Sequence, residues 1–89
     1  MSNVQIFYIY ADNCKECEKA LIIVNKSIVD SKIECEVKMF NSEDRVAVNI
    51  AIQHNIDNIP ACVIGKSVFQ LGTFNKEDIV KAIIKASKN

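Results

Sequence analysis

The segment Val4–Tyr10 constrains the fold of this chain more than any other part of it. Nearly all of its residues are β-branched or aromatic, and apolar side chains occupy both odd and even positions. Successive strand residues point to opposite faces of a sheet, so a strand with this pattern is expected to be covered on both sides. The sequence therefore predicts a central strand, in which Tyr8 and Tyr10 are interpreted as sheet residues.

A helix and a second strand are predicted to follow. Apolar residues recur at helical spacing from residue 14 to about residue 30. Residues 33–40 then alternate, with apolar side chains, Met39 among them, on one face and charged side chains on the other. Two strands joined through a helix are expected to be parallel, with a right-handed crossover.

A second helix is predicted after that strand. Asn41 or Ser42 can accept hydrogen bonds from the free backbone N–H groups at its start. Glu43 and Asp44 suit the positive end of its dipole and are expected in its first turn. The helix is expected to end near His54.

A hairpin and a third helix complete the predicted order. Residues 61–64 and 67–71 are predicted to be short strands, and Gly65-Lys66 suits a two-residue turn with glycine first. Asn75 suits the cap of a third helix, whose buried stripe begins at Ile79.

The order β-α-β-α-β-β-α describes an α/β fold in which three helices flank a four-stranded mixed sheet. No internal repeat, linker or low-complexity tract interrupts the chain, so residues 1–89 are expected to form one domain. Hydrophobic residues make up 49% of the chain, which is enough for a core that needs no disulfide staples.

The charge balance gives no electrostatic reason to expect a nucleic acid or an acidic membrane as partner. Eleven basic and eleven acidic side chains give a formal net charge of zero. The segment Met1–Gln5 lacks the basic start of a secretion signal, and no apolar run approaches the length of a membrane span. We therefore expect a cytoplasmic protein that binds neither nucleic acid nor membrane, and we expect it to be a monomer.

Cys14 and Cys17 form the candidate reactive site. Cys14 follows a strand and opens a helix, where unpaired backbone N–H groups and the positive dipole end favour a thiolate. At an unperturbed pKa of about 8.5, roughly 3% of a thiol is ionised at pH 7, whereas about half is ionised at a pKa of about 7. Lys15 favours a lower pKa and three nearby carboxylates oppose it, so a moderate lowering is expected.

The spacing of the two cysteines suits thiol–disulfide exchange. Cys17 lies one helical turn beyond Cys14, on the same side of the helix, and can close an intramolecular disulfide with it. We expect the exposed Cys14 to attack a substrate disulfide and the more buried Cys17 to displace the product. Lys15 and Glu16, which lie between them, are expected to contact the substrate.

Other interpretations of the cysteines stay open at this point. Cys14 and Cys17 can also be a structural pair, or half of a zinc site completed by Cys35, Cys62 or His54. The sequence lacks a second Cys-x-x-Cys or a histidine pair with ligand spacing, so no metal is expected. Core packing in strands is the better explanation of the other two cysteines.

Three segments resemble the thioredoxin family, in the right order and over nearly the whole chain: Tyr10–Glu18, Asn55–Pro60 and Gly72–Ile79. They are similar to the strand-to-helix turn of the family's active site, the segment with its cis-proline and the entry to its last helix. The resemblance implies a thioredoxin fold and a cis Ile59-Pro60 bond beside the two cysteines. It also implies that the backbone at residue 59 meets an extended substrate.

The chain departs from the family pattern in several places. Asn13 stands where the family has tryptophan, Lys15-Glu16 stands where it has Gly-Pro, and no counterpart to its buried acid is evident. The length is closer to that of glutaredoxins, but the basic residue and the double glycine of their glutathione site are not matched.

The resemblance implies a thiol–disulfide oxidoreductase that acts on protein disulfides and receives electrons from a thioredoxin-type reductase. No bound cofactor is expected, and glutathione is not favoured. A glutathione-dependent, glutaredoxin-like protein is the second hypothesis. The third is a non-enzymatic binding module that holds a partner at the Pro60 edge.

Overall fold

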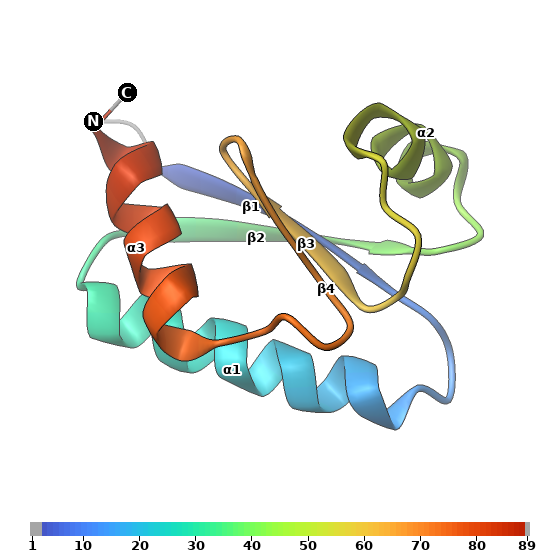
Figure 1. The fold of residues 1–89 in the computed structure, drawn as a ribbon, viewed down its shortest axis with the longest axis horizontal. Coiled ribbons are helices and arrows are strands. Elements are labelled where there is room, and N and C mark those ends of the chain that lie inside the picture. Colours follow the sequence, from blue (N-terminus) through green and yellow to red (C-terminus); the bar gives the residue numbers. More distant parts are fainter. Residues whose placement is uncertain (1–2, 89) are drawn as a thin grey trace.

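The computed structural model describes residues 3–88, and its elements follow the predicted order (Figure 1). The strands and helices are β1 (Val4–Tyr10), α1 (Lys15–Ser31), β2 (Cys35–Asn41), α2 (Arg45–His54), β3 (Ala61–Ile64), β4 (Ser67–Gln70) and α3 (Lys76–Ser87). Over this part of the chain the predicted α/β class is confirmed. None of these helices combines the length and the apolar character needed to cross a bilayer.

The strands of residues 3–88 form one mixed sheet in the order β2-β1-β3-β4. β1 is parallel to β2, as predicted for two strands joined through a helix, and antiparallel to β3. β3 and β4 form the antiparallel hairpin. In this register Tyr8 of β1 lies opposite Met39 of β2 and Cys62 of β3. β1 is therefore an interior strand, as its composition predicts.

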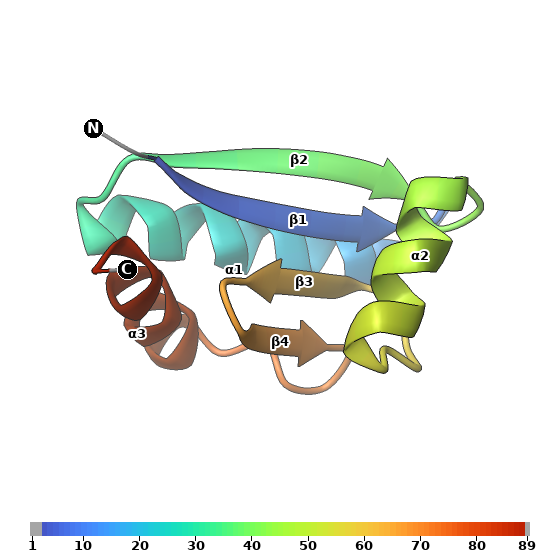
Figure 2. The same ribbon diagram turned by 90° about the horizontal axis from the view of Figure 1, so that it is seen from above.

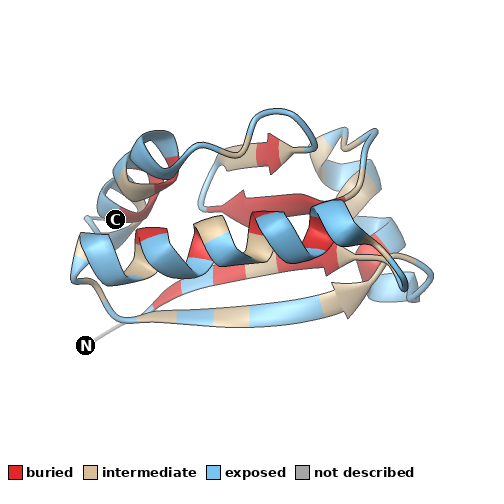
Figure 3. Cartoon of the chain, turned by 90° about the horizontal axis from the view of Figure 1, so that it is seen from below, coloured by how far each residue is buried: buried red, intermediate tan, exposed pale blue. Residues whose placement is uncertain are grey.

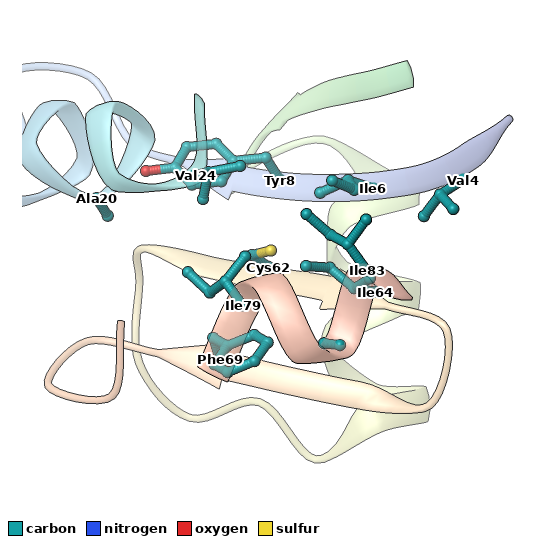
Figure 4. Close-up of a cluster of buried hydrophobic side chains, with 11 residues drawn as sticks. Val4, Ile6, Tyr8, Ala20, Val24, Cys62, Ile64, Phe69, Ile79 and Ile83 are labelled. Atoms are coloured by element: carbon teal, nitrogen blue, oxygen red, sulfur yellow. The ribbon is translucent and has the colours of Figure 1, made fainter. Parts of the chain in front are cut away.

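Helices cover both faces of the sheet (Figures 1 and 2). α1 and α3 pack on one face, and α2 covers one end of the other. The larger core, shown in Figure 4, joins the sheet to α1 and α3 and contains Val4, Ile6, Tyr8, Ala20, Val24, Cys62, Ile64, Phe69, Ile79, Ala82 and Ile83. The smaller core joins Ile9 and Ala61 to Ala47 of α2. Both faces of β1 are thus packed near its C-terminal end.

The buried stripe of α1 faces the sheet (Figure 3). It consists of Cys17, Ala20, Val24 and Ser27. The hydroxyl of Ser27 donates a hydrogen bond to the carbonyl oxygen of Ile23 at 2.7 Å, so its burial leaves no unpaired donor. Because the stripe begins with Cys17, the pattern that packs this helix also places the second cysteine against the core.

Local signals at the hairpin and at the last helix are confirmed. Gly65 has a φ of +60°, and the two-residue turn that it begins joins Ile64 to its register partner Ser67. Asn75 is the N-cap of α3, and its side-chain oxygen accepts a hydrogen bond from the backbone N–H of Asp78 at 3.2 Å.

The start of α2 differs from the prediction. The helix begins at Arg45 and its N-cap is Asp44, instead of Asn41 or Ser42. The Asn41 side-chain oxygen accepts a hydrogen bond from the backbone N–H of Glu43, and the Asn41 carbonyl accepts one from Asp44. These bonds close a turn ahead of the helix, so the prediction that Glu43 and Asp44 lie in its first turn is wrong.

Two strand predictions also need correction. β2 begins at Cys35 instead of Ile33, and β4 ends at Gln70 instead of Leu71. Met39, which was predicted on the buried face of its strand, is 47% exposed. β2 is an edge strand with a neighbour on one side only, so the helices shield its side chains less than those of β1.

Candidate redox site at the start of helix α1

Cys14 is the N-cap of α1. Its backbone is extended, with φ −113° and ψ 103°, and its Sγ accepts a hydrogen bond from the backbone N–H of Cys17 at 3.1 Å. The first N–H groups of a helix have no acceptor within it, and here a sulfur atom supplies one. The predicted position of Cys14, over the open beginning of a helix, is confirmed.

The turn before Cys14 directs the chain into this cap. Asn13 has a φ of +54°, in the left-handed region that asparagine adopts more readily than most residues. The carboxylate of Asp12 accepts a hydrogen bond from the side-chain amide of Asn41 at 3.2 Å, which joins the turn to the end of β2. Asp12 and Asn13 together end β1 and set the direction in which α1 starts.

Cys14 and Cys17 form a disulfide, with Cα atoms 5.2 Å apart. Cys17 is only 4% exposed, whereas Cys14 is half-buried. An attacking sulfur must reach the substrate, while a resolving sulfur must reach only the other cysteine. The difference in exposure therefore suits Cys14 for the first step and Cys17 for the second.

Lys15 and Glu16 lie between the two cysteines, and both are exposed. The carboxylate of Glu16 forms an ion pair with Lys19 at 3.6 Å, and both side chains are open to solvent. Exposed pairs of this kind add little stability. The outer surface of the first turn therefore carries charges of both signs, and a role of Lys15 and Glu16 in substrate binding stays a prediction.

A hollow of about 250 Å³ opens beside the disulfide, between α1, the end of β1 and the exposed Met39 of β2. It is lined by Tyr8, Tyr10, Ala11, Asp12, Asn13, Cys14, Cys17, Glu18, Leu21 and Met39. Cys17 lines it despite being almost fully covered. The recess is mainly apolar and open to solvent, so Cys17 borders it although little of the cysteine's own surface is exposed.

Tyr8 belongs to the site, although its position in the sequence predicts only a sheet residue. Its side chain is fully buried, and its hydroxyl donates a hydrogen bond to the carbonyl oxygen of Cys17. Figure 4 shows the hydroxyl directed toward α1. Burial, with a smaller effect of Cys62, raises the pKa of Tyr8 to about 12. A buried tyrosine hydroxyl usually has a hydrogen-bond partner, so the sequence indicates that such a partner exists but does not identify it.

The Ile59-Pro60 bond is cis, as the resemblance implies. Pro60 is fully buried, and Ile59 is half-buried against the smaller core. The next residue, Ala61, pairs with Ile9 near the end of β1. Pro60 therefore lies at the end of the sheet from which the chain turns toward Cys14.

Solved structures share this fold, whereas no protein-family model and no curated protein matches the chain. A thioredoxin-like protein of Clostridium perfringens superimposes with a TM-score of 0.69 at 16% identity, over 94% of this chain and 71% of that one. Thioredoxin 1 of Thermosipho africanus superimposes with a TM-score of 0.61 at 17% identity, over 94% of both chains. The oxidised thioredoxin of Plasmodium falciparum does so with 0.61 at 12% identity, over 94% of this chain and 81% of that one.

This chain has the thioredoxin fold. At these identities the fold alone follows from the likeness, and the chemistry rests on the residues of the site. The close cysteine pair at the first turn of α1 supports thiol–disulfide chemistry at that general level.

The two other cysteines of this thioredoxin fold lie in its sheet as free thiols. The predicted core position is confirmed for Cys62, whereas Cys35 is only partly buried and packs against the edge of that core. Cys62 is fully buried, and burial raises its pKa to about 12. Cys35 is half-buried in β2, and burial raises its pKa as well. A thiol that resists ionisation is a poor nucleophile, so these sulfurs contrast with Cys14 at its helix end.

Ligands for a metal do not converge in the described part of the thioredoxin fold. Within residues 3–88, no three side chains of histidine, cysteine, aspartate or glutamate gather in a way that could hold an ion. His54, considered above as a zinc ligand, lies in the last turn of α2, across the sheet from α1 (Figure 2).

Proposed function

We propose that this protein is a thiol–disulfide oxidoreductase that reduces or exchanges protein disulfides through Cys14 and Cys17. One observation carries the proposal: Cys14 is the N-cap of α1, its Sγ accepts the Cys17 backbone N–H, and it pairs with Cys17 in a disulfide. In the reduced protein this geometry is expected to favour the Cys14 thiolate, and it keeps a second sulfur within bonding reach.

The reaction has two exchanges. In the first, the Cys14 thiolate attacks one sulfur of the substrate disulfide, and the bond between the substrate sulfurs breaks. One substrate thiolate leaves and takes a proton from solvent, while Cys14 is held in a mixed disulfide. In the second, the Cys17 thiol loses its proton and its sulfur attacks Cys14 Sγ. The second substrate thiolate leaves, so two electrons have passed from the protein dithiol to the substrate.

The helix end acts on the charge that Cys14 carries. The Cys17 N–H is aimed at Cys14 Sγ, and the positive dipole end of α1 lies beside it. Both favour the thiolate over the thiol, which raises the fraction of reactive sulfur near neutral pH. The same groups favour Cys14 as the leaving sulfur when the first exchange runs in reverse, because there a substrate thiolate attacks the substrate sulfur of the mixed disulfide and the more stable Cys14 thiolate departs faster.

The substrate is expected to meet the protein at the edge of Ile59 and Pro60 and at the exposed turn of Lys15 and Glu16. An extended peptide can use backbone hydrogen bonds at such an edge. Side chains of both signs at the turn suit substrates of varied charge. The thioredoxin fold and the position of Pro60 at the same end of the sheet support this proposal.

A thioredoxin-type reductase is the proposed electron source, and the protein is proposed to work as a cytoplasmic monomer. Cys35 and Cys62 are free thiols, which suits a reducing compartment. A thioredoxin reductase with its nicotinamide donor, compared with glutathione and its reductase, distinguishes this source from the glutaredoxin-like alternative. Recycling by glutathione alone would reassign the protein to that class.

The deciding experiment follows reduction of insulin disulfides with dithiothreitol as the reductant. Wild-type protein is expected to accelerate the reaction and Cys14→Ser to abolish the acceleration. When the reduced Cys17→Ser variant is mixed with insulin after dithiothreitol has been removed, it is expected to accumulate a mixed disulfide on Cys14. Cys35→Ser is the matched control, since that cysteine is also partly accessible and remote from the helix end. Equal rates with wild type and Cys14→Ser would contradict the proposal and leave the binding module, in which a double serine variant still holds its partner.

A further inference from the structure

The hydroxyl of Tyr8 makes a contact that stands out among the side-chain hydrogen bonds. It crosses from β1 to the first turn of α1 and ends on the carbonyl oxygen of Cys17. Within residues 3–88, no other side-chain hydrogen bond joins the sheet to this helix. The residue that receives it is the cysteine that must close the disulfide.

The ring of Tyr8 is held on several sides. Phe74 meets it edge-on, with ring centroids 6.4 Å apart, and Met39 and Cys62 are its cross-strand neighbours. The raised pKa keeps the hydroxyl protonated wherever thiol exchange proceeds, so it remains a donor. Because the Tyr8 hydroxyl is buried and its ring is fixed by packing, its hydrogen bond can restrict the position of the Cys17 carbonyl.

We propose that Tyr8 is a positioning residue for Cys17, which it holds within reach of Cys14 while the disulfide is open. The inference rests on the function proposed above and assigns part of that reaction to a residue of the central strand. Tyr8 donates no electron and forms no covalent bond in it.

The hydrogen bond from Tyr8 matters most when the disulfide is open. The covalent link between Cys14 and Cys17 is then lost, and the first turn of α1 is free to fray. A hydrogen bond from the rigid sheet to the Cys17 carbonyl limits that freedom and raises the effective concentration of the second sulfur. The disulfide becomes more stable relative to the dithiol, and the mixed disulfide is resolved faster.

Attack by Cys14 is expected to depend on Tyr8 much less. The N–H that faces Cys14 Sγ belongs to the peptide unit between Glu16 and Cys17, whereas Tyr8 binds the carbonyl of the next unit. If the role of Tyr8 were purely structural, its loss would lower stability without slowing one step more than the other. A variant that slows resolution by Cys17 but not attack by Cys14 therefore distinguishes the positioning role from a structural one.

The test compares Tyr8→Phe with Ser27→Ala in the full chain. Ser27 is a matched control because its hydroxyl is also buried and donates one hydrogen bond, to the carbonyl oxygen of Ile23, further along α1 than the two cysteines. In glutathione buffers, Tyr8→Phe is expected to lower the equilibrium constant for the Cys14–Cys17 disulfide by about threefold to tenfold, the effect of one lost hydrogen bond. A tenfold fall corresponds to about 30 mV in potential.

The kinetic arm uses a disulfide substrate and quenches the mixed disulfide with acid. Tyr8→Phe is expected to prolong its lifetime by about the same factor while the rate of attack stays within about twofold of wild type. Ser27→Ala is expected to lower stability and to match wild type in both the equilibrium constant and the lifetime. If Tyr8→Phe loses only thermal stability and keeps both the equilibrium constant and the lifetime, the positioning role is wrong. If wild type neither forms the disulfide nor reduces insulin, the proposed function itself has failed.

A second variant covers the case in which Tyr8→Phe does not fold. The chain has two tyrosines, so Tyr10→Phe leaves Tyr8 as the only position for biosynthetic 3-fluorotyrosine. The fluorinated phenol is a stronger donor, and it is expected to raise the disulfide equilibrium constant and shorten the mixed-disulfide lifetime. An unchanged or lower constant would overturn the inference.

Discussion

Cys14 accepts the hydrogen bond that begins helix α1, and Cys17 donates it across 3.1 Å. The candidate nucleophile is thus also the helix cap, so the same contact contributes to helix stability and to the ionisation of the Cys14 thiol in the reduced protein. The stability of the first turn and the reactivity of Cys14 are therefore linked, and variants of this turn should change both.

In the reduced protein the thiols of Cys14, Cys35 and Cys62 should react at different rates. At pH 7, iodoacetamide is expected to alkylate Cys14 first, because the helix end favours its thiolate. Cys35 should follow slowly, and Cys62 should react only in denaturant, since burial raises the pKa of both. Mass spectrometry of timed digests gives the order. Modification of Cys62 at the rate of Cys14 in folded protein would contradict the burial argument.

Asn13 should be sensitive to the shape of the side chain that replaces it. Asn13→Gly is expected to be tolerated, whereas Asn13→Val should cost about 1–2 kcal/mol, because a β-branched residue resists the left-handed backbone. Urea unfolding measures the loss. Asn55→Val is the control, since Asn55 has a φ of +56° at the end of α2. Only the Asn13 variant should also alter the equilibrium constant of the Cys14–Cys17 disulfide. If both variants change that constant equally, the turn at Asn13 has no specific effect on the cysteine pair.

Stability should fall in alkaline solution. Burial raises the pKa of Cys62 from 9.0 and that of Tyr8 from 10.0, each to about 12, so the unfolded chain releases these protons first. Their contribution is complete below pH 9.0 and is lost as the pH rises toward about 12. Each group adds a slope of at most about 1.4 kcal/mol per pH unit. The free energy of unfolding of the oxidised protein, measured by urea at several pH values, should show this decline. Cys62→Ala should make it shallower, and an unchanged slope would show that Cys62 takes no part.

The packing of α3 should be needed for the site to form. Ile79 is fully buried in the core that contains Tyr8, so Ile79→Ala should cost about 2–5 kcal/mol. Ile84, on the same helix, is 37% exposed, and Ile84→Ala should stay within about 0.5 kcal/mol of wild type. Thermal and urea unfolding give both values. Similar losses in the two variants would mean that α3 is not held through this stripe.

Features that depend on residues close together in the chain could be predicted from the sequence. The order of elements follows from apolar periodicity, the hairpin from Gly65-Lys66, and the cap of α3 from Asn75. The place of Cys14 at a helix start was predicted in the same way, because a cap depends on residues within one turn of it. Asn41 could either cap α2 or form a turn with its own side chain. It forms the turn, so α2 begins after Asp44, later than predicted.

The sequence by itself determined the fold class and the pair of cysteines at the start of α1. The tertiary structure alone decided which groups surround that pair. Tyr8 reaches the Cys17 carbonyl only because α1 packs back on β1, and Met39 lies open because β2 is at the sheet edge. Periodicity records which face of an element is apolar, but it carries no information about which distant residue that face will meet. Contacts of that kind form only when the helices pack on the sheet, and they give the cysteine pair at the start of α1 surroundings different from those of Cys35 and Cys62 in the sheet.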